Sequence, residues 1–208
     1  LNLNVPSNGL NFDLDFVEFT VTSSIPILAK TGEQEFGLGV KLSGLKLSDT
    51  LWGLVDSENL MPKDPGSIEF VIDGATILEE GLTSGAIMEN HNLDPLGFGQ
   101  ILKFRLKDFF LDALGLKIEA SGSFEFDNGD FETFEGIPRP IGNGSVKLEG
   151  SDAFIDRLEK MQLFPSETIM GARMMLALLM RVEDDDTLIS EFEIDEKGKI
   201  YANGQRLR

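Results

Sequence analysis

The sequence contains no cysteine and a single histidine, His91, and these shortages remove several classes of chemistry. Without cysteine the chain has no disulfide, thiolate nucleophile, cysteine-based zinc site or iron–sulfur cluster. One histidine argues against a histidine-rich metal site and against a Ser–His–Asp triad. Glycine loops for nucleotide phosphates, zincin helices and nucleophile elbows do not occur either. We therefore expect a protein that is not an enzyme, with no catalytic residues, metal ligands or cofactor.

Basic residues are also scarce, because 18 Lys and Arg stand against 36 Asp and Glu, for a net charge of −18. Such a chain repels a phosphate backbone, so a nucleic acid is not an expected partner. Trp and Tyr, the aromatic residues of recognition surfaces, occur once each, whereas Phe occurs 16 times. Phe is the aromatic residue of a dry interior, which favours a large apolar surface inside the protein.

Long hydrophobic runs are missing as well. Within Glu167–Arg181 the unbroken apolar run is Met174–Met180, far shorter than the ~20 residues that cross a bilayer. We expect no transmembrane segment in these 208 residues. The first residues, LNLNVPSNGL, lack a basic region and an apolar core. We therefore expect residues 1–208 to be a single β-rich domain and the C-terminal portion of a longer protein.

Alternation of apolar and polar residues is the dominant pattern, and it predicts β-strands with one buried face. The pattern slips by one residue near Phe16–Val17 and again at Gly44, as a β-bulge requires. Turn signals separate the predicted strands, which favours an antiparallel meander. The alternating runs cover residues 12–21, 36–47, 68–72, 102–106, 114–126 and 188–194. The turn signals are Thr31-Gly32, Asp73-Gly74, Asp127-Asn128-Gly129, Asn143-Gly144, Glu196-Lys197-Gly198 and Asn203-Gly204.

Helical patterns are few. Residues 48–57 predict a short helix capped by Ser48 or Asp49. Residues 151–181 predict two helices that meet at Pro165, the first of them capped by Ser151. The expected fold is mainly β (α+β): a large curved antiparallel sheet or meander, with a helical hairpin near 151–181 packed on it.

Methionine is concentrated in the predicted hairpin, where five of the seven methionines lie between Met161 and Met180. Methionine suits irregular cores and also adaptable hydrophobic grooves, and the pattern leaves both open. The candidate ligand-binding residues are Met161, Met170, Met174, Met175 and Leu178.

An acidic cluster lies in FDNGDFETFEG, with Asp127, Asn128, Asp130 and Glu132 around a glycine. Carboxylate and amide oxygens of this kind could bind calcium. The spacing is not that of a helix–loop–helix calcium site, and a plain hairpin turn is the other interpretation.

Two segments resemble an uncharacterised family of Gram-negative envelope proteins, the domain of unknown function numbered twenty-one twenty-five. They are LSDTLWGLVDSENLMPKDPGSIEFVIDG and the stretch from LEGSDAFIDRLEKMQLFPSE to NGQRL, within residues 38–85 and 144–207. Met61 and Lys63 depart from the family pattern. The family is similar in style to AsmA-like proteins, whose curved antiparallel sheets carry an apolar inner face and are associated with lipid handling.

The resemblance implies a periplasmic protein, tethered to the inner membrane by an N-terminal segment absent from this chain. Together with the apolar strand faces, it leads us to expect a module that binds or passes lipid or another hydrophobic ligand in envelope homeostasis. The alternative is a structural or interaction scaffold of the envelope that contacts another envelope protein. A free strand edge without a hydrophobic groove would favour the scaffold.

Overall fold

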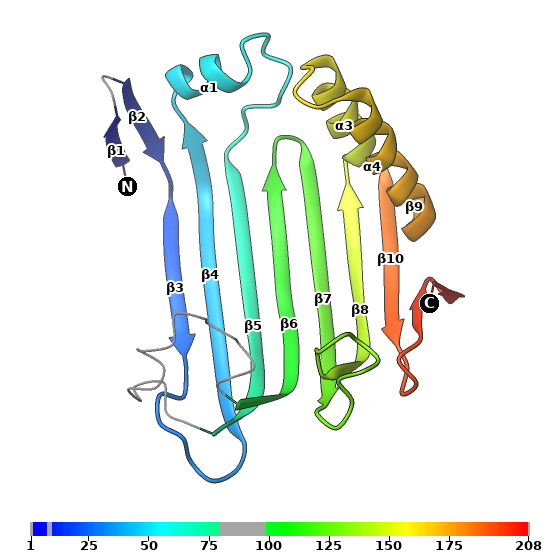
Figure 1. Cartoon of the computed structure of the whole chain (residues 1–208). Coiled ribbons are helices and arrows are strands. Elements are labelled where there is room, and N and C mark those ends of the chain that lie inside the picture. The colour runs from blue at the N-terminus through cyan, green and yellow to red at the C-terminus, as the bar shows by residue number, and fades with distance from the viewer. Residues whose placement is uncertain (1, 8–9, 80–98, 208) are drawn as a thin grey trace.

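The computed structural model describes residues 2–7, 10–79 and 99–207, which form a twelve-stranded antiparallel sheet and three helices (Figure 1). His91 lies outside the described residues. The strands are β1 (Asn2–Ser7), β2 (Leu10–Asp15), β3 (Glu18–Ser24), β4 (Gln34–Leu47), β5 (Gly66–Leu78), β6 (Gly99–Ala113), β7 (Leu116–Asp127), β8 (Arg139–Glu149), β9 (Arg181–Asp184), β10 (Thr187–Ile194), β11 (Ile200–Ala202) and β12 (Gln205–Arg206). The helices are α1 (Asp49–Val55), α3 (Ser151–Lys160) and α4 (Ser166–Leu179).

The sheet follows the order of the chain, so the expected meander is confirmed. Strands β4 to β8 are successive neighbours, β10 follows β8, and β11 and β12 continue from β10. At the other side, β2 pairs with the upper end of β4 and β3 pairs with residues 37–43 of β4. Helices α3 and α4 interrupt the meander between β8 and β10, and β9 pairs with β10 beside them. The expected helical hairpin near 151–181 is therefore present.

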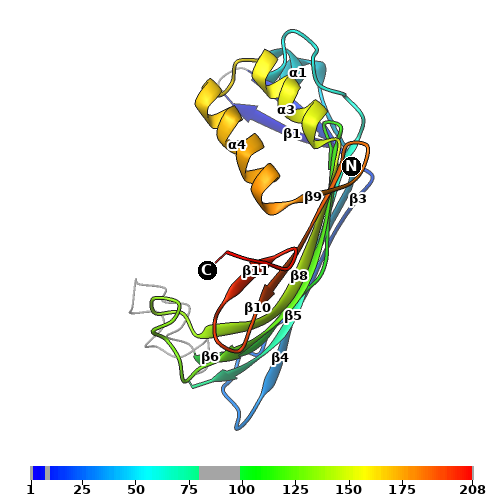
Figure 2. The same cartoon turned by 90° about the vertical axis from the view of Figure 1, so that its right-hand side faces the viewer.

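Seen edge-on, the long strands bend into an arch, and α3 and α4 lie on its concave side (Figure 2). Breaks in strand register account for part of the bend, because a bulge kinks its strand and increases the local twist. The predicted slip at Gly44 is confirmed by a register shift between Leu42 and Leu45, where Gly44 has a φ of 66°. The predicted slip near Phe16 is also present, as the boundary between β2 and β3.

Helix α1 closes a small core at the upper end of the arch. Ser48 caps it by accepting a hydrogen bond from the Leu51 N–H, as the sequence predicts. Trp52 and Met61 are buried, and the Lys63 ammonium lies 5.5 Å from the centre of the Trp52 ring. Of the two residues that depart from the family pattern, Met61 is buried within this core and Lys63 is exposed at its surface.

The helical hairpin is held by charge as well as by packing. Ile155 of α3 and Ile169 of α4 are buried, and Arg173 forms ion pairs with Asp156 and Glu159 of α3. The predicted cap at Ser151 is wrong. Gly150, with a φ of 78°, occupies the cap position, because a chain leaving β8 must reverse in the left-handed region that glycine tolerates.

Two predicted turns are also wrong, because Asp73-Gly74 lies within β5 and Asn143-Gly144 lies within β8. One turn lies instead at the start of the run 114–126, which the sequence predicts to be a strand. Leu114 and Gly115 connect β6 to β7, with φ values of 59° and 74°. Positive φ at both central residues is the geometry of a two-residue hairpin turn, and Asn203-Gly204 adopts it too, as the sequence predicts.

Candidate functional site

The concave face of the arch, here called the inner face, carries four rows of side chains across β4, β5, β6, β7, β8 and β10. From the helices downward, strand register gives the rows Leu42, Ile68, Leu111, Ile118, Leu148, Leu188; Val40, Phe70, Phe109, Ala120, Val146, Ser190; Leu38, Ile72, Leu106, Gly122, Gly144, Phe192; and Phe36, Gly74, Phe104, Phe124, Gly142, Ile194. Only Ser190 among them is polar, and its hydroxyl donates to the Leu179 carbonyl at the end of α4. This bond places the rows on the side of the sheet where α4 lies.

Glycines in the two lower rows make room for aromatic rings. A Cβ at Gly74 would lie 2.5 Å from the Phe36 ring, and Cβ atoms at Gly142 and Gly122 would lie 3.0 and 3.3 Å from the Phe124 ring. Gly122 and Gly144 are direct partners across β7 and β8, so no side chain rises from the sheet at this point. The lower half of the inner face is therefore a glycine floor with Phe side chains beside it, whereas its top row is wholly aliphatic.

The inner face has no second layer over most of its length among the described residues. Its large side chains are only half-buried, and none of the Phe residues whose burial is described is fully buried. The three atoms nearest to a Cβ built at Gly144 all belong to β7, and the Phe124 ring among them is 3.9 Å away. In a β-sandwich such a face would be covered by a second sheet about 10 Å away. Among the described residues the upper end has such a cover, since Ser190 lies under α4 with no exposed surface.

The predicted ligand-binding set divides into two groups. Met170, Met174, Met175 and Leu178 gather on the solvent side of α4 and are all more than half exposed, with Met174 at 66%. Met161 lies apart, half-buried at the end of α3. The core interpretation is therefore wrong for the four residues of α4, and their contact with a ligand stays a prediction.

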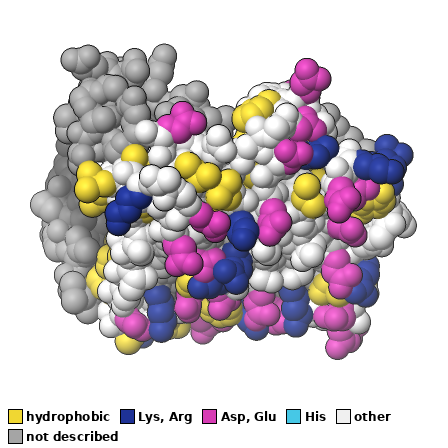
Figure 3. Space-filling model, turned by 90° about the horizontal axis from the view of Figure 1, so that it is seen from below, with side chains coloured by type: hydrophobic (Ala, Val, Ile, Leu, Met, Phe, Trp, Pro, Cys, Tyr) yellow, Lys and Arg dark blue, Asp and Glu magenta, His cyan; other side chains and the backbone are white. Residues whose placement is uncertain are grey.

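The opposite, convex face of the sheet, here called the outer face, carries charge. Figure 3 shows Lys or Arg side chains alternating with Asp or Glu along its lower edge, which is the side behind the sheet in Figure 1. The charges are paired: Lys41 lies 3.0 Å from Glu18, Lys117 lies 2.9 Å from Glu119, and Lys147 lies 2.8 Å from Glu149. The first pair joins neighbouring strands and the other two each lie within one strand, and such pairs of opposite sign suit a solvated sheet face.

A hollow of about 780 Å³ also lies on the outer face, lined by Arg105, Lys107, Ser121, Ser145 and Glu191, among others. Its two basic side chains are already used, because both form ion pairs with Asp73. The hydrogen bond from Lys107 and then that from Arg105 hold the pKa of Asp73 below its usual value. This neutralised and half-polar surface offers no free charge to an anionic ligand, so the outer face is the weaker candidate.

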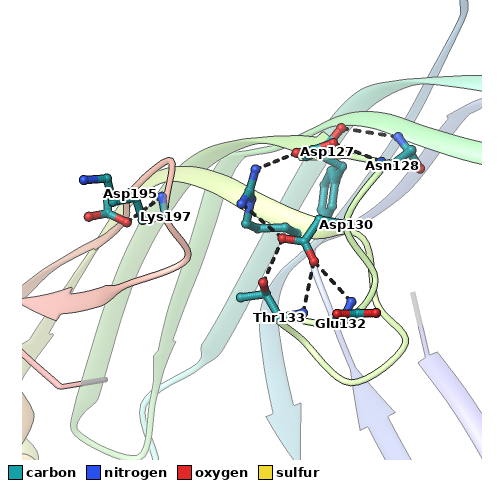
Figure 4. A network of polar contacts seen from close by, with 10 residues as sticks. Asp127, Asn128, Asp130, Glu132, Thr133, Asp195 and Lys197 are labelled. Atoms are coloured by element: carbon teal, nitrogen blue, oxygen red, sulfur yellow. Dashed lines mark hydrogen bonds and ion pairs between the residues drawn. The ribbon is translucent and has the colours of Figure 1, made fainter.

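The acidic cluster around Asp130 holds its own loop together (Figure 4). The Asp130 carboxylate accepts hydrogen bonds from the backbone N–H groups of Glu132 and Thr133 and from the Thr133 hydroxyl, and Arg139 lies 3.0 Å from it. These bonds, the two from Thr133 first, lower the pKa of Asp130. Among the described residues no group of three carboxylates or imidazoles is arranged to hold a metal ion. The cluster closes an eleven-residue loop after β7, which is longer than a plain hairpin turn.

Sequence reasoning missed the glycines of the inner face as part of the site. The sequence does contain a signal for them, because glycines occupy positions in the apolar phase of the strands. Gly122 lies two residues from Phe124, and Gly142 and Gly144 are likewise two residues apart. Glycine at apolar positions of a strand marks a place where something approaches the backbone closely. In this protein the Phe124 ring is one such neighbour, since it lies against Gly122 and Gly142.

Comparison of the chain with models of protein families, with curated proteins and with solved structures gives no match. Across the described ranges, none of the helices has the length and apolar character needed to cross a membrane.

Proposed function

We propose that the protein is a non-enzymatic binding module that holds the hydrocarbon part of a lipid, or of a similar elongated hydrophobic molecule, on its inner face. The observation that carries this proposal is a single-layer sheet whose concave face carries four rows of side chains that are apolar except for Ser190 and whose large side chains are only half-buried. At roughly 25 cal/mol per Å² of apolar surface removed from water, covering such a face is strongly favourable. A bound apolar chain provides that cover.

The dimensions suit an acyl chain. On β6 the four rows run from Phe104 to Leu111, eight residues, which at about 3.3 Å per residue gives an apolar face roughly 25 Å long. One leaflet of a bilayer has a hydrocarbon thickness of about 15 Å. The inner face can therefore hold a whole chain lengthwise, with room for it to slide along the arch. No charged side chain stands in the four rows, so a polar head group belongs at an end of the arch.

The proposed place of action is the periplasm of a Gram-negative cell. It is supported by the resemblance of residues 38–85 and 144–207 to the envelope family described above. An open apolar face with net charge −18 is also consistent with a carrier that stays dispersed in water while it holds a lipid. Fractionation of the source cells tests this location directly, and recovery from the cytosol would overturn it.

The test of binding uses two neighbouring residues of β7 that point to opposite faces. Ala120 lies in the second inner row, and Ser121 is exposed on the outer face. The purified protein and the variants Ala120→Arg and Ser121→Arg are compared by native mass spectrometry, followed by extraction and identification of lipids. We expect bound lipid in the unmodified protein and in Ser121→Arg, and its loss in Ala120→Arg, because a guanidinium would be desolvated beside the chain.

Circular dichroism must show that both variants fold, and a second inner variant, Val146→Lys, repeats the test on β8. Lipid that persists in both folded inner variants would overturn the proposal. A lipid-free protein that takes up neither added fatty acid nor added phospholipid would also overturn it. That second outcome would favour the scaffold alternative, with another protein covering the inner face.

A further inference from the structure

The two edges of the sheet are built differently. At one edge β3 offers seven residues that are all exposed, and among the described residues only β4 pairs with it. At the other edge the upper strand is β9, with four residues, and the lower strand is β12, with two. Proteins usually protect a free edge with short strands, charges, prolines or bulges. The β9 edge follows this rule, since RVED runs into Asp185 and Asp186, and the β3 edge does not.

The β3 edge is also the part of this acidic chain with little charge. From Val17 to Ala29 the only charged side chain is Glu18, and it is paired with Lys41 at 3.0 Å. Large apolar side chains stand exposed there instead: Val17 is 83% exposed, Phe19 58%, Val21 54% and Ile25 57%. A second copy of a protein with net charge −18 would be repelled over most of the surface, and least at this edge.

We infer that two copies of this chain pair through β3, antiparallel, about a two-fold axis at Val21. In that register Val21 meets Val21 of the second copy, Thr20 meets Thr22, and Phe19 meets Ser23. Glu18 then meets Ser24, so no like charges face one another across the new pair. Just beyond the strand, Val17 meets Ile25, so each of the four exposed apolar residues gains a neighbour.

The two-fold axis runs perpendicular to the sheet, and this has a structural consequence. Phe19 and Val21 are partners of Leu42 and Val40, so they extend the inner-face rows onto β3. Pairing about a perpendicular axis keeps the inner faces of both copies on the same side, because antiparallel strands in register share their faces. The dimer would therefore have one continuous apolar concave surface. The inference rests on the edge alone and holds whether or not the inner face binds a lipid.

The first test is the oligomeric state of the full chain, measured by sedimentation over a range of concentrations. We expect a dimer, and we expect Val21→Lys to weaken it by about tenfold or more, because two ammonium groups would face each other at the axis. The matched control is Val182→Lys, which changes an even more exposed valine, at 74%, on the opposite edge and should leave the dimer intact. Mixing Val21→Lys with Val21→Glu should restore pairing, which excludes a folding defect as the cause of the loss.

The second test uses the absence of cysteine from the chain. With Val21→Cys, mild oxidation should join two copies at the axis through a disulfide formed as both thiols give up their protons and one electron each to the added oxidant. Val182→Cys should give little cross-linked product. A protein that stays monomeric at every concentration, or a Val21→Lys variant that still dimerises, would overturn the inference. A lipid-bound monomer would do so while leaving the proposed function in place.

Discussion

The inner and outer faces belong to the same strands, yet their side chains make different kinds of interaction. On β7, Ala120 and Phe124 point inward without a covering layer, while Lys117 and Glu119 point outward as an ion pair. The outer face suits solvent, because its side chains are charged and several of them form ion pairs on the same or a neighbouring strand. The inner face is incomplete, because apolar side chains have no comparable way to satisfy each other within one layer.

The difference shows where stability and function lie. Exposed ion pairs contribute little to folding, since solvent screens them, so the outer face can vary without much loss. The inner face provides most of the apolar contact that the sheet has, and the close fit of Phe rings against glycines gives it a definite shape. A change on the inner face should therefore cost far more than a change of similar size on the outer face. Four predictions, ordered by expected effect, test this contrast.

The largest effect is expected at Gly74. A Cβ there would lie 2.2 Å from the Lys103 carbonyl oxygen and 2.5 Å from the Phe36 ring, and a backbone atom cannot easily move away. Gly74→Ala should destabilise the protein by about 3 kcal/mol or more, as overpacking does. Urea unfolding followed by circular dichroism measures this.

The control for Gly74 is Gly53→Ala in α1, where an added Cβ meets nothing within 4 Å. That change should be neutral or stabilising by up to about 1 kcal/mol, because alanine favours a helix. Equal effects of the two substitutions would show that the inner face is not closely packed against its glycines.

The second effect concerns Phe124, whose ring lies against Gly122 and Gly142. Phe124→Ala should cost about 2 kcal/mol, less than the ~3–5 kcal/mol of a fully buried Phe, because this ring is half-buried. The same change should weaken lipid uptake, since it removes an aromatic ring that stands beside the glycine floor. Chemical denaturation and native mass spectrometry of one preparation measure both. A loss of stability with unchanged lipid uptake would mean that Phe124 contributes to folding and not to lipid binding.

Much of this contrast could be predicted from the sequence, because alternation is a local property. Leu38, Val40 and Leu42 were placed on one face by spacing alone, and their slip at Gly44 was visible in the same way. The helical hairpin followed from the apolar stripe around Ile155 and from Pro165. What stayed hidden was the absence of a covering layer, since that depends on the whole fold.

Glycine was the main source of error. Asp73-Gly74 and Asn143-Gly144 have the composition of turns, yet both lie within long strands. A Cβ at Gly74 would meet the Lys103 carbonyl oxygen and the Phe36 ring, and a Cβ at Gly144 would meet the Ser121 carbonyl oxygen. These partners lie far away in the sequence. The candidate site was placed on α4 for a related reason: clustered methionines are visible in the sequence, whereas a floor assembled from β7 and β8 is not.

A smaller effect is expected at Asp73 on the outer face, which pairs with Arg105 and Lys107. Since these partners lower its pKa in the folded state, the stabilisation is present above the unfolded value of about 3.9 and is lost as the pH falls through the folded value. Asp73→Asn should cost up to about 1 kcal/mol at pH 7, and the difference should vanish in acid. Denaturation at pH 7 and at pH 3 measures it, and a difference that grew in acid would contradict the assignment.

The smallest effect is expected at Lys41, next in sequence to Leu42 and on the opposite face. Its pKa is raised by the hydrogen bond and the charge of Glu18, so its contribution is present below the usual pKa of lysine and is lost only as the pH rises through the raised value. The pair is nonetheless exposed, and solvent and salt screen it. Lys41→Gln should leave the thermal midpoint unchanged within error at pH 7, whereas Leu42→Gln should lower it clearly, because an amide would replace an alkyl group between Ile68 and Phe19. Equal shifts for the two neighbours would mean that the faces are not energetically distinct, and the case for the inner face as the binding surface would lose its physical basis.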